Sequence, residues 1–171
     1  MEAGGDVLQA KLVDYSFNLL PEEGSTLAEA IRRTMLVQHP GARTVTPSMY
    51  PPTRMRPQAV AFEAKLAAAG SDPLVQLTIW AAASFERLRQ ILSGKGILCT
   101  LPLVQVRGHD WHVWFARDAA KTLDLHGPFL IGSTSTLFDT FKLVRSLRAL
   151  GEWAAGPFKE WFETAISAMP S

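Results

Sequence analysis

Two carboxylates and a lysine are the residues of this 171-residue chain whose types and spacing could do chemistry. Glu63 and Lys65 lie two positions apart in an apolar run, 60–66, and Asp14 lies in another apolar run far upstream. Because alternate side chains of a β-strand share one face, Glu63 and Lys65 would point the same way. With a second carboxylate from a neighbouring strand, such a pair could bind a divalent cation and hydrolyse a phosphodiester bond.

The same three side chains also have an interpretation without chemistry. An ion pair of Lys65 with Glu63 or with Asp14, at the edge of a sheet, would only stabilise the fold. A carboxylate held among strands costs free energy unless it is paired or bound to a metal, and either arrangement meets that requirement. The residue pattern by itself leaves both interpretations open.

Hydrophobic periodicity predicts the elements that must position these residues. We expect strands at 11–20, 60–66, 97–107 and 111–117, the last two forming a hairpin that turns at 108–110. We expect helices at 27–38, 73–92, 136–150 and 157–168. Two long helices that cover the faces of a mixed sheet indicate an α/β or α+β layered domain.

Local signals mark the boundaries of these elements. Thr26 and Glu29 match a capping box before the first helix, and Ser71-Asp72-Pro73 is a strong start for the second. Gly127-Pro128 is expected to break a short segment after the hairpin, and Gly151 to end the third helix. Residues 1–10 look like a flexible lead-in, 44–57 like an extended proline-rich loop, and 11–169 like a single domain.

The same periodicities predict which side chains share a face. The core-facing residues of the strand at 60–66 are expected to be Val60, Phe62, Ala64 and Leu66. The apolar face of the helix at 136–150 is expected to carry Leu137, Phe141, Val144 and Leu147.

Composition excludes several classes of protein. Hydrophobic residues make up 47% and charged residues 19%, which supplies a core and excludes global disorder. No apolar stretch reaches the roughly 20 residues of a membrane helix and we see no secretory signal, so we expect an intracellular protein, cytoplasmic or nuclear. Cys99 stands alone, which excludes an internal disulfide and a cysteine-based zinc site. The net charge of +1 argues against a dedicated nucleic-acid binder but allows a local basic groove.

Five short segments, in this order, resemble the motifs of a known family. They are Val13-Asp14-Tyr15, Phe62-Glu63-Ala64-Lys65, Gln76-Leu77-Thr78-Ile79-Trp80, Gly108-His109-Asp110-Trp111 and Gly132-Ser133-Thr134-Ser135-Thr136. The chain resembles the PD-(D/E)XK nuclease superfamily, and within it the fungal PD-(D/E)XK nuclease-like domain, over about residues 11–163. Val13 replaces the usual proline, and the upstream helix that often adds an acid would precede residue 11. The resemblance implies a restriction-endonuclease-like core, with a mixed central sheet flanked by helices.

The resemblance also implies roles for individual residues. Asp14 and Glu63 would hold Mg²⁺ or Mn²⁺, with the backbone carbonyl of Ala64 as a third ligand. Lys65 would orient the attacking water, help to deprotonate it and offset charge on the phosphoryl oxygens. Gln76, on the first turn of its helix, would contact the water or the phosphate; its alternative is an ordinary polar helix residue.

Three functional hypotheses follow. The first is a Mg²⁺- or Mn²⁺-dependent phosphodiesterase that acts on DNA or RNA. The second is a nuclease-derived scaffold without nuclease activity, which performs another reaction or only binds, because a fold does not fix a function. The third is a homodimeric interaction module, in which apolar strands and tryptophans form the subunit interface.

Polar residues around the predicted hairpin are weaker candidates for a functional site than the residues named above. His109 and Asp110 fall in the turn, and a strand would aim His112 away from His109, so a turn role is favoured over a zinc site. Arg107 could face a phosphate, although a surface arginine is the favoured interpretation.

Aromatic and hydroxyl residues nearby are also ambiguous. Trp80, Trp111 and Trp114 could stack on bases, but aromatic residues at such spacing are more typical of a core. The segment 132–136 lacks the lysine of a phosphate-binding loop and the pattern of a nucleophile turn, so it is predicted to cap a helix.

Overall fold

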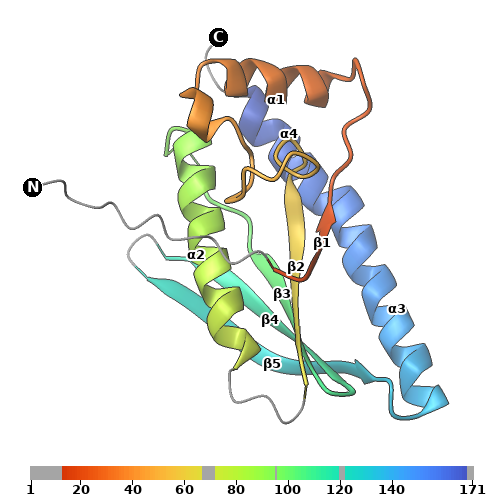
Figure 1. Ribbon diagram of the computed structural model, residues 1–171. Helices are drawn as coiled ribbons and strands as arrows, with labels where there is room; N and C mark the ends of the chain where they lie inside the picture. Colours follow the sequence, from red (N-terminus) through yellow and green to blue (C-terminus); the bar gives the residue numbers. More distant parts are fainter. Residues whose placement is uncertain (1–12, 67–71, 95, 120–121, 169–171) are drawn as a thin grey trace, which may run out of the picture.

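A computed structural model describes residues 13–66, 72–94, 96–119 and 122–168 of the protein. Its strands form one five-stranded sheet, in the order in which they follow along the chain (Figure 1). They are β1 (Tyr15–Asn18), β2 (Gln58–Lys65), β3 (Leu101–Arg107), β4 (Asp110–Asp118) and β5 (Leu123–Ser133). β2 and β3 run parallel and the other neighbours antiparallel, so the sheet is mixed.

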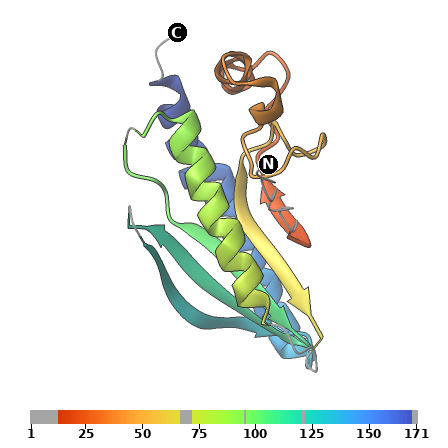
Figure 2. The same ribbon diagram turned by 60° about the vertical axis from the view of Figure 1, so that its left-hand side comes forward.

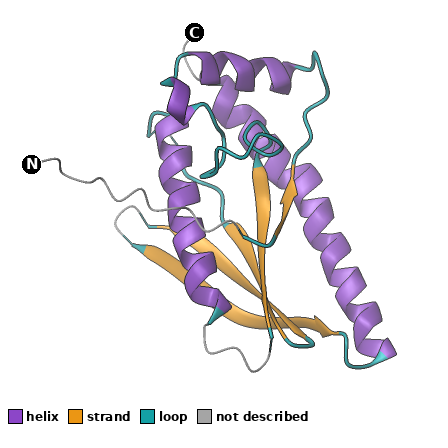
Figure 3. Cartoon of the chain, viewed as in Figure 1, coloured by secondary structure: helices purple, strands orange, loops and turns teal. Residues whose placement is uncertain are grey.

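Along the chain, helices lie between the strands and after the last of them (Figure 3). They are α1 (Thr26–Leu36), α2 (Pro73–Ile91), α3 (Leu137–Trp153) and α4 (Lys159–Ser167), with a 3₁₀ turn η1 (Pro40–Ala42) and a π-helical segment η2 (Ala154–Phe158). Among the described helices, none is both long and apolar enough to cross a membrane.

The two long helices cover opposite faces of the sheet. α2 connects the parallel strands β2 and β3, a connection that requires a long crossover. Ala61 of β2 lines a small cavity together with Ala81 of α2, which identifies the face under that helix. On the other face, a side chain added at Gly132 of β5 would meet the backbone of Leu143 in α3. Figure 2 shows α2 in front of the sheet and α3 behind it. This arrangement confirms the predicted α/β class.

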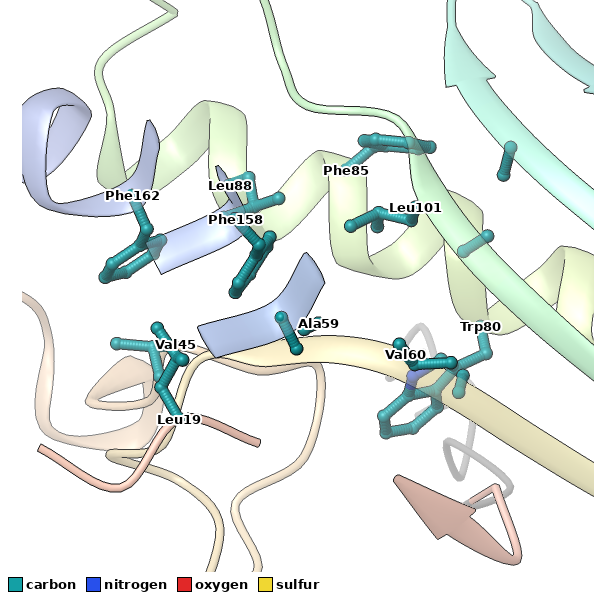
Figure 4. Packing of buried hydrophobic residues seen from close by; sticks show 14 of the residues in the cluster. Leu19, Val45, Ala59, Val60, Trp80, Phe85, Leu88, Leu101, Phe158 and Phe162 are labelled. Atoms are coloured by element: carbon teal, nitrogen blue, oxygen red, sulfur yellow. The ribbon is translucent and has the colours of Figure 1, made fainter. Parts of the chain in front are cut away.

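Figure 4 shows the main hydrophobic core, where side chains from α2, η2, α4 and the first half of β2 converge. The labelled residues are Leu19, Val45, Ala59, Val60, Trp80, Phe85, Leu88, Leu101, Phe158 and Phe162. Arg87 of α2 donates from Nε to the Thr44 carbonyl at 2.7 Å, which anchors the proline-rich loop to this core. The last residues of β2, from Glu63 to Lys65, are not part of this hydrophobic core. They are therefore not needed for its packing and can form a polar site.

Most predicted elements are confirmed, but β5 was not expected. Gly127-Pro128 lies inside this strand instead of breaking a segment. β5 is an edge strand, so a proline there removes no bond from the middle of the sheet. Gly127 has a φ of +147° and packs against the Trp114 ring, where a side chain would not fit. The residues that usually interrupt a strand are therefore compatible with this one.

The packing of α3 differs from the prediction. Leu143 is the residue buried against β5, and Leu147 packs partly buried against the core as predicted, whereas Leu137, Phe141 and Val144 are exposed. The helix also passes Gly151 and continues to Trp153, after which Pro157 lies within η2 rather than at a helix start. Apolar spacing identified the helix but not the side of it that faces the sheet.

Two smaller predictions are corrected. Ser25, not Thr26, caps α1, because the Ala28 amide donates to Ser25 Oγ at 3.2 Å, and Glu29 pairs with Arg32. Asp72 caps α2 as expected, accepting from the Leu74 amide at 2.9 Å. The expected flexible lead-in, residues 1–10, lies outside the described residues.

Candidate active site

β2 presents different surroundings on its two sides near its end. Val60 and Phe62 are buried as predicted, but Ala64 and Leu66 on the same side are exposed, which corrects that part of the predicted core. The side that carries Glu63 lies under α2 and is equally buried. β2 is therefore covered on both faces up to Glu63, as a strand that pairs with a parallel neighbour often is, whereas its last two residues are open to solvent.

The structure brings Asp14, Glu63 and Lys65 together. Tyr15 of β1 lies opposite Phe62 of β2, so Asp14, one residue earlier, comes beside the end of β2. There the Ala64 amide donates a hydrogen bond to Asp14 Oδ2 at 2.8 Å. Glu63 and Lys65 share the face under α2, as alternation along the strand predicts.

Glu63 is the most unusual residue of this group, because its side chain is 0% exposed. Its Oε1 lies 2.6 Å from Lys65 Nζ, and its Oε2 has no hydrogen-bonding partner among the described residues. Burying a carboxylate is costly unless its oxygens are satisfied, and one ammonium satisfies only one of them. The second oxygen can accept a further donor or a cation.

Lys65 links this buried acid to solvent. Its side chain is 31% exposed, whereas that of its partner Glu63 is 0% exposed. Hydrogen bonding to Glu63, then the negative charge of Glu63 and finally that of Asp14, raise the pKa of Lys65 above its ordinary value. Lys65 is therefore an ammonium ion throughout the neutral pH range.

A chain of hydrogen bonds holds the start of α2 above β3 and β4. Trp114 Nε1 donates to Gln105 Oε1 at 2.9 Å, and Gln105 Nε2 donates to Asp72 Oδ1 at 2.8 Å. Gln105 is the register partner of Glu63 on the neighbouring strand. The first turn of α2, which carries the half-buried Gln76, is thus fixed above the Glu63–Gln105 row.

Sequence reasoning missed Gln105. Its signal in the sequence was a single amide inside the apolar run of β3, and its two partners lie in different elements. Trp114 was expected in the core or on a base, and it is partly buried with its indole N–H bonded to Gln105.

The β3–β4 hairpin borders the site. The Gly108 amide donates to the Lys65 carbonyl at 3.1 Å, and the Thr134 amide donates to the His109 carbonyl at 3.0 Å. His109 therefore has the predicted turn position, and its Nδ1 lies 3.1 Å from Thr134 Oγ1. Thr136 caps α3, as expected for this hydroxyl-rich segment, by accepting from the Asp139 amide.

Arg107 is the basic residue that the sheet places next to Lys65. The two are register partners on β3 and β2, and residues paired in this way share a face. The Arg107 side chain is exposed, and no ion pair involves it within the described part of the chain. By contrast, Arg117 on β4 pairs with Asp124 at 2.8 Å.

The donor set fits a hard divalent cation. Asp14 and Glu63 provide carboxylate oxygens, including the buried Oε2 of Glu63, which has no hydrogen-bonding partner among the described residues. Ala64, whose carbonyl is the expected third ligand, directly follows Glu63 on β2. Oxygen ligands completed by water are typical of Mg²⁺ and Mn²⁺ sites. No cluster of three or more His, Cys, Asp or Glu side chains occurs among the described residues, so a zinc-type site is not supported there.

Comparison with known proteins agrees with this geometry. A family model of the PD-(D/E)XK nuclease superfamily matches residues 3–159, which is most of the chain. No curated protein and no solved structure matches it.

Proposed function

The chain belongs to the PD-(D/E)XK nuclease superfamily, and we propose that it is a metal-dependent phosphodiesterase that hydrolyses DNA or RNA. The observation that carries this proposal is the carboxylate of Glu63. It is fully buried and paired on one oxygen with Lys65, and its other oxygen has no partner in the part of the chain that the structure describes. A buried acid of this kind is expensive for a purely structural role and is suited to a ligand.

In this proposal Asp14, Glu63 and the Ala64 carbonyl hold Mg²⁺ or Mn²⁺. When bound, such an ion polarises the phosphodiester and lowers the pKa of a coordinated water. Asp14 is positioned by its hydrogen bond from the Ala64 amide, which leaves Oδ1 for a ligand. Glu63 is positioned by Lys65, which leaves Oε2.

Lys65 acts as a cation in this proposal. In the metal-free protein the hydrogen bond to Glu63 raises the pKa of Lys65, so that the side chain carries its proton at neutral pH before an ion binds. Its ammonium, on a partly exposed side chain, orients the attacking water and offsets the negative charge that develops on the phosphoryl oxygens. The electrostatic role of Lys65 is the one that this arrangement supports, and its expected role in deprotonating the water stays a prediction.

Two further residues contact the substrate in this proposal. Gln76, held above the site by the bond between Gln105 and Asp72, contacts the water or the reacting phosphate. Arg107, exposed and on the same face as Lys65, contacts a neighbouring phosphate of the nucleic-acid backbone. A nucleic-acid substrate favours a cytoplasmic or nuclear location.

The alternative is a scaffold of this superfamily without nuclease activity. The observation that favours it is the pairing of Lys65 with Glu63 at 2.6 Å, which partly satisfies both charges without any ion. Such a protein would show neither metal binding at these acids nor cleavage.

A metal titration followed by cleavage assays separates the two. A ligand that binds only the native state raises the melting temperature, so Mn²⁺ should stabilise the wild-type protein but not Asp14→Asn. Asp124→Asn, which removes an exposed acid of β5, is the matched control and should keep the shift. Lys65→Ala should abolish cleavage of single- and double-stranded substrates while remaining folded. Absence of both the Mn²⁺ shift and cleavage in the wild type would establish the scaffold interpretation.

A further inference from the structure

The outer face of α3 combines aromatic rings with cations. The inner side of the helix packs on β5, through Leu143 and through a hydrogen bond from Ser146 Oγ to the Ile131 carbonyl at 2.9 Å. Residues three or four positions apart lie on the same side of a helix, and this spacing brings five exposed side chains together on the opposite side. This outer face consists of Phe138, Phe141, Lys142, Arg145 and Arg148.

The two phenylalanines of the outer face are open to solvent. Phe138 is 70% exposed and Phe141 is 66% exposed. In Figure 1 the first turns of α3 extend past the end of the sheet, in agreement with this exposure. Lys142 Nζ lies 4.4 Å from the centre of the Phe138 ring, so a cation already accompanies one of the rings. Exposed rings beside cations form the kind of surface on which the bases of an unpaired nucleic-acid strand stack.

Two arginines give the outer face a positive charge. Lys142 is paired with Asp139 at 3.2 Å. Arg145 and Arg148, in contrast, have no ion pair within the described part of the chain. Phe141 precedes Arg145 by about one turn of helix and Arg148 by about two, so both arginines lie on the side of this ring. Because like charges on one face repel a second copy of it and attract an anion, the partner that fits is anionic and carries flat apolar groups.

The outer face begins at the end of the sheet that carries the candidate active site. The Gly108 amide donates to the Lys65 carbonyl, so the turn between β3 and β4 lies against the end of β2. The Thr134 amide donates to the His109 carbonyl, which joins the same turn to the segment before α3. Figures 1 and 2 both show β2 ending where α3 starts, at one end of the molecule. The candidate site lies on the α2 side of the sheet and the outer face on the α3 side, so a ligand that contacts both bends around this end.

We propose that the outer face of α3 binds an unpaired strand of nucleic acid that bends around this end of the sheet from the candidate active site. Arg145 and Arg148 contact phosphates, and bases stack on Phe138 and Phe141. A duplex resists such a bend, since its persistence length is about 150 base pairs, whereas an unpaired strand is flexible and exposes the faces of its bases. The substrate of the proposed function is then a nucleic acid with a single-stranded segment, and the choice of nucleic acid as the partner rests on that function.

Fluorescence anisotropy of a labelled oligothymidylate measures binding by the full chain, with a chelator present so that no strand is cut. For a single strand, each phosphate contact contributes about 0.7 to the steepness of log K against log salt, so the double variant Arg145→Gln/Arg148→Gln should have a slope shallower by about 1.4. Phe141→Ala should weaken binding about tenfold and keep the wild-type slope, because stacking releases no counterions. Phe141→Trp should keep the affinity, since an indole also stacks on bases.

The matched control is the double variant Arg33→Gln/Arg54→Gln. Both arginines are exposed and have no ion pair among the described residues, and they lie on α1 and on the proline-rich loop before β2. The control loses the same charge as the α3 variant and should keep the wild-type slope. Circular dichroism of each variant should match the wild type.

Several results would overturn the proposal. They are a wild type that does not bind oligothymidylate, a slope that the α3 arginine variant leaves unchanged, and an affinity that Phe141→Ala leaves unchanged. Binding of polyglutamate or of phosphatidylserine vesicles through the outer face, in place of oligothymidylate, would assign it to an acidic protein or to a membrane. Failure of the proposed function looks different, because a wild type without a Mn²⁺ shift or cleavage that still binds the strand through α3 would refute only the activity.

Discussion

Asp14 and Ala64 are 50 positions apart in the chain, yet the Ala64 amide donates a hydrogen bond to the Asp14 carboxylate at 2.8 Å. The donor belongs to the residue between Glu63 and Lys65. One backbone group therefore positions the acid that directly precedes β1 beside the acid and the lysine of β2. Two of the three side chains proposed to act together lie on β2 itself, and the third is fixed to β2 by this hydrogen bond.

Replacing Glu63 by glutamine should stabilise the protein in the absence of metal. The substitution removes a buried charge with an unpartnered oxygen, and Lys65, being partly exposed, can turn to water at little cost. Compared with the wild type, we expect Glu63→Gln to have a free energy of unfolding in chelator that is higher by about 1 kcal/mol. We also expect Mn²⁺ no longer to stabilise this variant. Urea unfolding with and without Mn²⁺ measures both effects.

Glu86→Gln is the control for that substitution. Glu86 pairs with Arg89 at 3.0 Å on the surface, where an ion pair contributes little. The free energy of unfolding of Glu86→Gln should stay within a few tenths of a kcal/mol of the wild-type value. If Glu63→Gln were instead strongly destabilised in chelator, the buried pair would be structural and the proposed metal role would lose its support.

The contribution of Lys65 to stability should depend on alkaline pH. Because the folded state raises the pKa of Lys65 above the ordinary 10.5, the folded state binds the proton more tightly than the unfolded state. The stabilisation is then complete below the ordinary pKa and is lost as pH rises through the folded pKa. In metal-free protein, the difference in unfolding free energy between the wild type and Lys65→Met should be constant at neutral pH and shrink only above about pH 10.

The pH profile of cleavage separates the two roles of Lys65. A lysine that keeps its proton contributes no change in rate across neutral pH, whereas a lysine that acts as the base makes the rate rise as it loses its proton. Comparison of the rate profiles of the wild type and Lys65→Arg measures this difference.

Arg107→Ala should weaken nucleic-acid binding without affecting metal binding. The binding constant K decreases with salt, and each arginine that contacts a phosphate makes the slope of log K against log salt steeper by about 1. Loss of Arg107 should therefore make this slope shallower by about 1. Fluorescence anisotropy at several salt concentrations measures this slope. Arg117→Ala is the control, because Arg117 is engaged with Asp124, and its slope should match the wild type. An unchanged slope for Arg107→Ala would make Arg107 an ordinary surface residue.

Local patterns predicted much of the fold. The cap at Asp72 and the apolar spacing after it located α2, and alternation along β2 placed Glu63 and Lys65 on one face. The position of Asp14 beside them required the antiparallel register of β1 and β2, which is a contact between distant segments. The resemblance to a known family supplied that expectation, whereas periodicity could not.

The residues that escaped prediction did so for specific reasons. β5 contains Gly127-Pro128, which usually breaks a strand but is tolerated at the edge of this sheet. Gln105 looks like an interruption in an apolar strand until its partners Asp72 and Trp114 are known. Helical spacing grouped Leu137 with Phe141, but a spacing cannot say whether a group faces the sheet or the solvent.

The unpartnered oxygen of Glu63 links the supply of divalent ions to the lifetime of the protein, if the proposed metal site is correct. An ion that binds only the folded chain adds to its stability, and the gain falls as free ion becomes scarce. The fraction of chains open to proteases then grows, since that fraction follows the free energy of unfolding. Under such conditions a cell would lose this protein by turnover as well as by lack of a cofactor.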